Sequence, residues 1–157
     1  MLKFYPTLLT IVFIVLLSSC IHSDEAGVFH PIDSAGWQYG DTLNFRLEET
    51  DSLWHGDIAV VVRHSAAYPY NNIWLELSYP PTDSITPDSV NIILADDFGH
   101  WLGRGLGLSY QKVDTVIRDL TLSSANIGLR HIMRNDKLTD IEQIGIIFKP
   151  TGKLISK

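Results

Sequence analysis

Beyond residue 41, apolar and polar side chains alternate along most of the chain, which is the pattern of β-strands with one buried face. The stretch 72–80 shows it well, because Ile73, Leu75 and Leu77 alternate with Trp74 and Glu76. The pattern predicts strands over residues 42–49, 57–65, 72–80, 90–95, 113–122, 125–133 and 141–149. Helical periodicity is almost absent. Several short strands separated by turn residues predict an all-β fold, a single antiparallel β-sandwich of a jelly-roll-like kind.

The first 19 residues follow a different pattern. Lys3 is followed by an unbroken apolar run over residues 8–17, and small residues follow that run. Charge, apolar core and small residues in this order are typical of a secretory signal peptide. The run is shorter than the roughly 20 residues that a membrane-spanning helix needs. We therefore expect residues 1–19 to be a signal peptide that is removed.

The only cysteine, Cys20, stands directly after this segment, in the sequence Leu-Ser-Ser-Cys. This ending resembles the lipobox of bacterial lipoproteins. The resemblance implies cleavage before Cys20 and a lipid on its thiol, which would attach the protein to a membrane. The alternative is a secreted protein with a free thiol, but a single cysteine in an exported chain calls for an explanation, and its position after the signal peptide supplies one.

Composition and charge limit the kinds of partner that the protein could bind. The chain has 12 Lys and Arg against 18 Asp and Glu, a formal charge of −6, and removal of residues 1–19 would make it more negative still. An acidic domain is a poor partner for nucleic acid. Residues 20–36 are rich in Gly, Ser and Asp, which predicts a lipidated tether. Residues 37–157 would then form the β-sandwich domain.

Catalytic or metal-binding chemistry has only one candidate cluster, in which Asp96, Asp97 and His100 surround Gly99. A tight turn explains this sequence equally well, because Asp and Gly favour turns and Gly99 can adopt a positive φ. The histidines lack the close spacing of metal ligands, and there is no Gly-x-Ser-x-Gly motif. We therefore expect no enzymatic activity, no cofactor and no metal.

Aromatic residues offer a possible recognition patch, formed by Tyr68, Tyr70 and Trp74. Trp74 falls on the polar side of its strand, where a ring could stack on a sugar or contact a partner protein. The alternative is that these rings belong to the core, as Trp and Tyr usually do. The alternating glycines from Gly103 to Gly107 are interpreted as places of close packing, since no phosphate-loop sequence follows them.

Three segments together resemble one known family. They are YPYNNIWLEL at 68–77, SVNIILADDFGHWLGRGLG at 89–107 and MRNDKLTDIEQIGI at 133–146. They are similar to the gliding-motility lipoprotein H (GldH) family of Bacteroidetes-type bacteria, and the resemblance covers roughly residues 37–148. It implies an outer-membrane lipoprotein without enzymatic activity that is part of, or accessory to, the gliding motility and secretion machinery, with protein partners in the cell envelope.

Two questions stay open at this point. A lipid-anchored carbohydrate-binding module for polysaccharide capture is the alternative function, with a glycan stacked on Tyr70 and Trp74. The acidic stretch Ser23-Asp24-Glu25 after the cysteine resembles a surface-export signal, although a solvated tether has the same composition. The anchored domain could therefore lie on the periplasmic face of the outer membrane or on the cell surface.

Overall fold

A computed structural model describes residues 26–46, 54–79, 88–122 and 126–151, and these ranges contain β-strands and no helix. The strands are β1 (Ala26–Pro31), β2 (Trp37–Gln38), β3 (Leu43–Arg46), β4 (Trp54–Ser65), β5 (Asn72–Ser78), β6 (Asp88–Ile93), β7 (Arg104–Leu106), β8 (Ser109–Leu122), β9 (Asn126–His131), β10 (Lys137–Leu138) and β11 (Ile141–Pro150). The seven predicted strands coincide with β3, β4, β5, β6, β8, β9 and β11 within a few residues. The expected signal peptide and Cys20 lie outside the described ranges.

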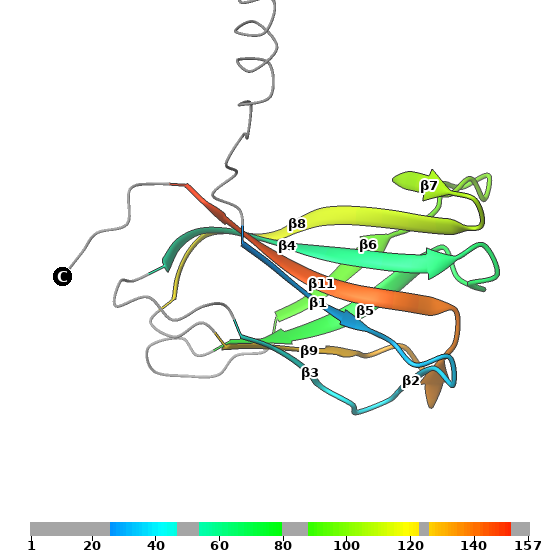
Figure 1. Cartoon of the computed structure of the whole chain (residues 1–157), viewed down its shortest axis with the longest axis horizontal. Helices are drawn as coiled ribbons and strands as arrows, with labels where there is room; N and C mark the ends of the chain where they lie inside the picture. Colours follow the sequence, from blue (N-terminus) through cyan, green and yellow to red (C-terminus); the bar gives the residue numbers. More distant parts are fainter. Residues whose placement is uncertain (1–25, 47–53, 80–87, 123–125, 152–157) are drawn as a thin grey trace, which may run out of the picture.

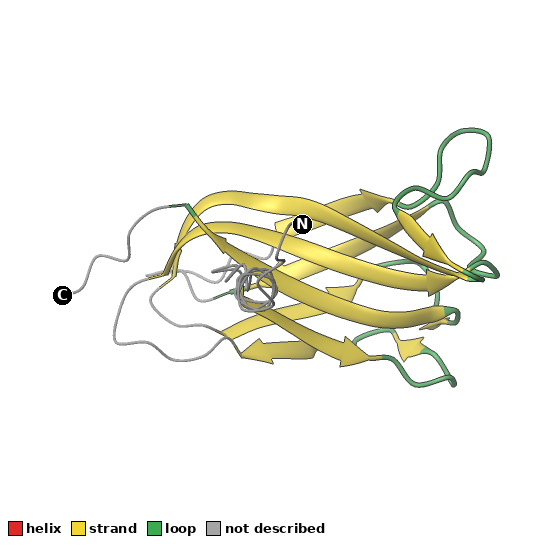
Figure 2. Cartoon of the chain, turned by 45° about the horizontal axis from the view of Figure 1, so that its top comes forward, coloured by secondary structure: helices red, strands yellow, loops and turns green. Residues whose placement is uncertain are grey.

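Two antiparallel sheets form a sandwich. One sheet has five strands in the order β1-β11-β4-β8-β7, and the other has four in the order β3-β9-β5-β6. A small third sheet pairs β10 with β2 at one end of the sandwich. Figures 1 and 2 show the two larger sheets facing each other, with the long strands β4, β8 and β11 side by side. The predicted all-β antiparallel sandwich is confirmed.

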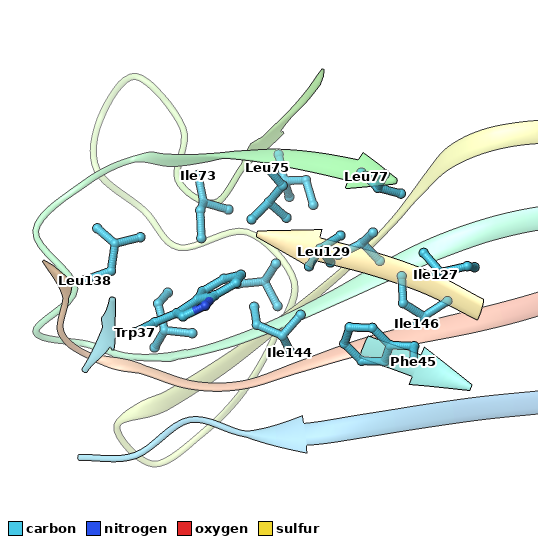
Figure 3. Close-up of a cluster of buried hydrophobic side chains, with 14 of the residues drawn as sticks. Trp37, Phe45, Ile73, Leu75, Leu77, Ile127, Leu129, Leu138, Ile144 and Ile146 are labelled. Atoms are coloured by element: carbon cyan, nitrogen blue, oxygen red, sulfur yellow. The ribbon is translucent and has the colours of Figure 1, made fainter. Parts of the chain in front are cut away.

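The core lies between the two larger sheets and is built by the alternation read from the sequence. Figure 3 shows apolar side chains from both sheets pointing toward one another. Strand β5 buries Ile73, Leu75 and Leu77 completely, and β11 does the same with Ile144 and Ile146. On β5 the residues between them, Trp74 and Glu76, lie closer to solvent, so this sheet has one apolar inner face and a more polar outer face.

The first strand differs from the prediction. Residues Ala26–Pro31, expected to be part of a tether over 20–36, pair with β11 along their whole length. The sequence pattern did not predict β1, because its core-facing residues Val28 and His30 are no more apolar than the residues between them. His30 Nε2 instead bonds the carbonyl oxygen of Asn44 at 2.8 Å, which links the edges of the two sheets. Residues Ala26–Pro31 are therefore an edge strand of the five-stranded sheet and not part of a tether.

Antiparallel pairing gives the sandwich two distinct ends. Strand β1 starts at Ala26 beside Phe148, close to the end of β11, and runs toward the opposite end. At that opposite end lie the connections 32–36, 66–71, 94–103 and 132–136, drawn as green loops in Figure 2. We call it the loop end. The end at which β1 begins is called the entry end.

Candidate functional site

The candidate site is an open groove at the loop end. One part of it, with a volume of about 550 Å³, is lined by Tyr70, Trp74 and residues 132–135. A second hollow, of about 270 Å³, is lined by Tyr39 and residues 132–136. The two hollows share residues 132–135, so they adjoin along the connection between β9 and β10. We call the surface formed by Tyr39, Tyr70, Trp74 and residues 132–136 the aromatic groove.

The three aromatic rings differ in exposure. Trp74 is 42% exposed, because it lies on the outer face of β5, and Tyr39 is 55% exposed in the turn after β2. Tyr70 is half-buried and packs against the core, with its ring edge-on to the ring of Tyr68 at 5.5 Å between centroids. Large apolar rings exposed beside polar groups are typical of recognition surfaces.

Main-chain hydrogen bonds hold the floor of the groove in place. The Ile132 amide donates to the Trp74 carbonyl oxygen at 2.9 Å, and the Trp74 amide donates to the Met133 sulfur at 3.3 Å. On the other side, the Tyr39 amide donates to the Asp136 carbonyl oxygen at 2.7 Å. The connection 132–136 is thus fastened both to β5, which carries Trp74, and to the turn that carries Tyr39. The groove is formed before any ligand arrives.

Polar side chains surround Trp74 on the outer face of the four-stranded sheet. Asn91 lies directly across from Trp74 in the β5–β6 pair, and Asn72 Nδ2 donates to Asn91 Oδ1 at 2.8 Å. Further along β5, Arg130 Nε donates to Glu76 Oε1 at 2.7 Å. That hydrogen bond and the charge of Glu76 raise the pKa of Arg130 above its usual value. This pair lies on the same face of the sheet as Trp74, because Glu76 is two positions further along β5 and Arg130 is its partner on β9.

His131 supports the groove from below. Its ring is fully buried, lies edge-on to the rings of Trp37 and Tyr39 at 5.2 and 5.7 Å, and bonds the Trp37 carbonyl oxygen through Nε2 at 3.2 Å. Burial lowers the pKa of His131, although the bonds to the backbone of Trp37 and Gln38 partly oppose that effect. The buried imidazole of His131 therefore packs behind the ring of Tyr39.

The structure places two of the three residues of the predicted recognition patch in the groove and the third in the core. The structure brings Tyr70 and Trp74 together, but Tyr68 is only 3% exposed and belongs to the core. Its hydroxyl donates to the Asn72 carbonyl oxygen at 3.2 Å, and burial raises its pKa. Sequence reasoning missed Tyr39 as a member of the site, since only the pairing of β2 with β10 brings it to residues 132–136.

The cluster of Asp96, Asp97 and His100 forms a turn. Asp96 Oδ1 accepts hydrogen bonds from the amides of Phe98 and His100 at 2.9 and 2.8 Å, and Oδ2 lies 3.0 Å from His100 Nδ1. The amide of His100 contributes most to lowering the pKa of Asp96. Gly99 has a φ of +83°, as predicted. In the described ranges, no three His, Cys, Asp or Glu side chains are grouped as metal ligands would be.

Two of the glycines near β7 also serve packing. At Gly105, a Cβ atom would lie 2.9 Å from the ring of Tyr110, so this ring packs on the glycine. Trp101 packs against the core and lies 4.5 Å, between ring centroids, from the buried His64. The interpretation of close packing is confirmed at Gly103 and Gly105. It is wrong at Gly107, where a Cβ atom would meet nothing and the φ of +65° is what favours glycine.

The structure is thus an all-β antiparallel sandwich with a surface groove at the loop end, and the comparisons with known proteins name its family. The family model described as GldH lipoprotein matches residues 26–147, so the chain belongs to the GldH lipoprotein family. Membership of a lipoprotein family implies a lipid anchor in a membrane. No helix in the described ranges is both long enough and apolar enough to span a bilayer.

A curated relative supports this assignment. The chain is 31% identical over 97 residues to the gliding motility lipoprotein GldH homolog of Christiangramia forsetii (strain DSM 17595 / CGMCC 1.15422 / KT0803). The match covers 60% of this chain and 57% of that relative, so it spans little more than half of the relative's length. No solved structure is significantly similar to the chain.

Two of the three segments that resemble the family meet at the aromatic groove. The segment 68–77 supplies Tyr70 and Trp74, and the segment 133–146 supplies Met133, Arg134 and Asp136. These two segments are far apart in the sequence, and the antiparallel pairing of β5 with β9 brings them together. The third segment, 89–107, forms β6, the turn at Gly99 and β7. Each of the three segments therefore contributes residues to the loop end of the domain.

Proposed function

We propose that this chain is an outer-membrane lipoprotein, anchored through Cys20, that serves the gliding motility and secretion machinery without catalysing a reaction. Membership of the GldH family supports the association with motility. The aromatic groove supports a binding role, because exposed rings stand there beside an arginine, an amide and a carboxylate, from Arg134, Asn135 and Asp136. Protein partners in the envelope machinery follow from the same family role.

The observation that carries this proposal is the placement of the groove relative to the anchor. Ala26 starts β1 six positions after Cys20, and a fully extended chain covers at most about 3.6 Å per residue. The entry end of the sandwich therefore stays within roughly 20 Å of a lipid on Cys20. Strand β1 runs from this end toward the loop end. The aromatic groove is thus directed away from the anchored end, where a partner can reach it.

The anchor and the cellular role are tested together in the host bacterium. Deletion of the gene should reduce surface spreading or, in a host that does not glide, secretion through the shared machinery. Wild-type protein and Ser19→Ala, which keeps a small residue before the cysteine, should restore the function and remain in the membrane fraction. Cys20→Ala should leave that fraction and fail to restore function. A deletion strain with normal spreading and normal secretion would overturn the proposed role.

The face of the membrane is tested separately by protease treatment of intact cells. Digestion of the wild type, with protection of a variant in which Ser23, Asp24 and Glu25 are all alanine, would place the domain on the cell surface. Protection of both proteins until the cells are lysed would place it in the periplasm. Lipidated protein found in the inner-membrane fraction would contradict the outer-membrane assignment.

A further inference from the structure

We propose that the aromatic groove is a saccharide-binding site, with Trp74 as the stacking platform and Tyr39 as the ring of an adjoining subsite. This inference goes beyond the cellular role, because it assigns a ligand class to the groove whether or not the motility association holds. It rests on the exposure of two rings, the polar groups around them, and the fixed floor between them.

Stacking is the first requirement of a sugar site, and the two exposed rings meet it. The weakly positive C–H groups on one side of a pyranose ring pack on the negative face of an aromatic ring. Trp74 and Tyr39 keep 42% and 55% of their surface exposed, although each belongs to a well-packed part of the fold. The two hollows that they line adjoin along residues 132–135, so neighbouring sugar units of one chain could occupy both.

Hydrogen bonding to hydroxyl groups is the second requirement. Each Asn side chain carries two N–H donors and an acceptor oxygen. The bond between Asn72 and Asn91 uses one donor of the first and one lone pair of the second, which leaves further groups beside Trp74. Asn135 lines both hollows, and the exposed Arg134 adds more donors at the rim. Rings flanked by amides match an amphipathic ligand with many hydroxyl groups.

The geometry disfavours an added peptide strand at this position. A bound strand needs free main-chain N–H and C=O groups. At Trp74 the N–H donates to the Met133 sulfur and the C=O accepts from the Ile132 amide, so both groups are already in use. Recognition here must use side chains, as sugar binding does. A proline-rich peptide could also dock on aromatic rings, so it serves as the competing probe in the test.

Rigidity and size fit the same ligand class. The three hydrogen bonds that hold residues 132–136 keep the distance between Trp74 and Tyr39 fixed, which lowers the entropic cost of binding. The larger hollow, about 550 Å³, lies within the roughly 300–1,000 Å³ typical of small-ligand sites. Because the groove is a surface hollow, it can accept units from within a polymer as well as chain ends.

The test uses the full-length lipidated protein in a zwitterionic detergent, since sugar-based detergents would compete for the site. Binding of soluble cello-, laminari-, chito- and galacturono-oligosaccharides, peptidoglycan fragments and a proline-rich peptide is measured by calorimetry. We expect saturable binding of at least one saccharide with a Kd in the range of roughly 10 μM to 1 mM. Trp74→Ala should weaken it at least tenfold, and Trp74→Phe should weaken it less.

Phe98→Ala provides the matched control, because Phe98 is also at the loop end and is 87% exposed but does not line the groove. It should leave the Kd unchanged, and Tyr39→Ala should weaken binding of longer oligosaccharides more than that of a single unit. Thermal unfolding of every variant excludes a folding defect as the cause. Binding of no saccharide, binding of the peptide alone, or saccharide binding that survives Trp74→Ala would overturn the proposal. None of these outcomes depends on the motility assay.

Discussion

The ring of Phe29 in β1 lies across Gly145 of β11, its direct cross-strand partner. A Cβ atom at position 145 would overlap the ring, so the glycine provides the space in which the ring rests. Glycine normally weakens a strand because it has no side chain to pack. Here an aromatic ring on the neighbouring strand covers the gap, which is a known way to support glycine in a sheet. The contact fastens the edge strand β1 to β11.

Substitution of Gly145 should show how much this contact contributes. Gly145→Ala should lower the free energy of unfolding by about 1–3 kcal/mol, because the Phe29 ring must leave its place. The same change in a Phe29→Ala background should cost clearly less, and the difference is the coupling energy of the pair. Urea denaturation of the four proteins measures it. Equal costs in both backgrounds would show that the ring and the glycine are not coupled.

The pattern of alternating residues predicted most of the fold because the central strands each bury one face. Strand β5 is the clear example, in which Leu75 is buried and Trp74 is exposed, as the alternation requires. Strand β1 escaped prediction because it is an edge strand held by pairing with β11 and by the bond from His30 to Asn44. Long-range pairing of that kind leaves little trace in the local sequence.

The candidate site was predictable only in part, for a related reason. Trp74 could be assigned to the outer face, since its strand has a strict period of two. Tyr68 and Tyr70 precede that strand, where no period tells a buried ring from an exposed one, and Tyr68 proved to be buried. Tyr39 reaches the groove through the β2–β10 pair and its bond to Asp136, which join positions far apart in the chain.

Tyr68 should contribute to stability and not to recognition. Its hydroxyl donates to the Asn72 carbonyl oxygen at 3.2 Å while its ring is buried. Tyr68→Phe should therefore lower the free energy of unfolding by about 0.5–1.5 kcal/mol, the usual net value of one hydrogen bond. Binding of any ligand that depends on Trp74 should stay within about twofold of wild type. Chemical denaturation and calorimetry measure the two effects. A strong loss of binding without a loss of stability would show that Tyr68 takes part in recognition after all.

Gly103 and Gly105 form a matched pair for testing the packing role of this segment. Gly103 has a φ of +101°, and a Cβ atom there would collide with the carbonyl group of Gln111, which belongs to the backbone of β8. Gly103→Ala should cost about 1–3 kcal/mol, the usual range for such strain. Gly105→Ala should cost less, because the half-buried Tyr110 ring that it meets can shift. Thermal or urea unfolding compares them, and a reversed order would contradict this assignment.

Acid should destabilise the domain through its two buried histidines. His64 and His131 are fully buried, and burial lowers the pKa of each below its usual value of about 6.5. His64 Nδ1 bonds the Ser65 carbonyl oxygen at 2.9 Å, and its Nε2 has no partner among the described residues. A second proton on this ring would therefore be buried without an acceptor, which is costly.

The sign of the pH dependence follows from these lowered pKa values. The unfolded chain binds protons on both histidines more readily than the folded chain does, so stability is complete above about pH 6.5 and falls as the pH decreases. Urea unfolding between pH 8 and pH 5.5 should show this loss, with a slope of at most about 1.4 kcal/mol per pH unit for each group. His64→Gln and His131→Gln should each reduce the slope, whatever they do to stability at pH 8. An unfolding free energy that stays constant over this range, or a slope unchanged in the double variant, would show that the buried imidazoles do not control acid stability.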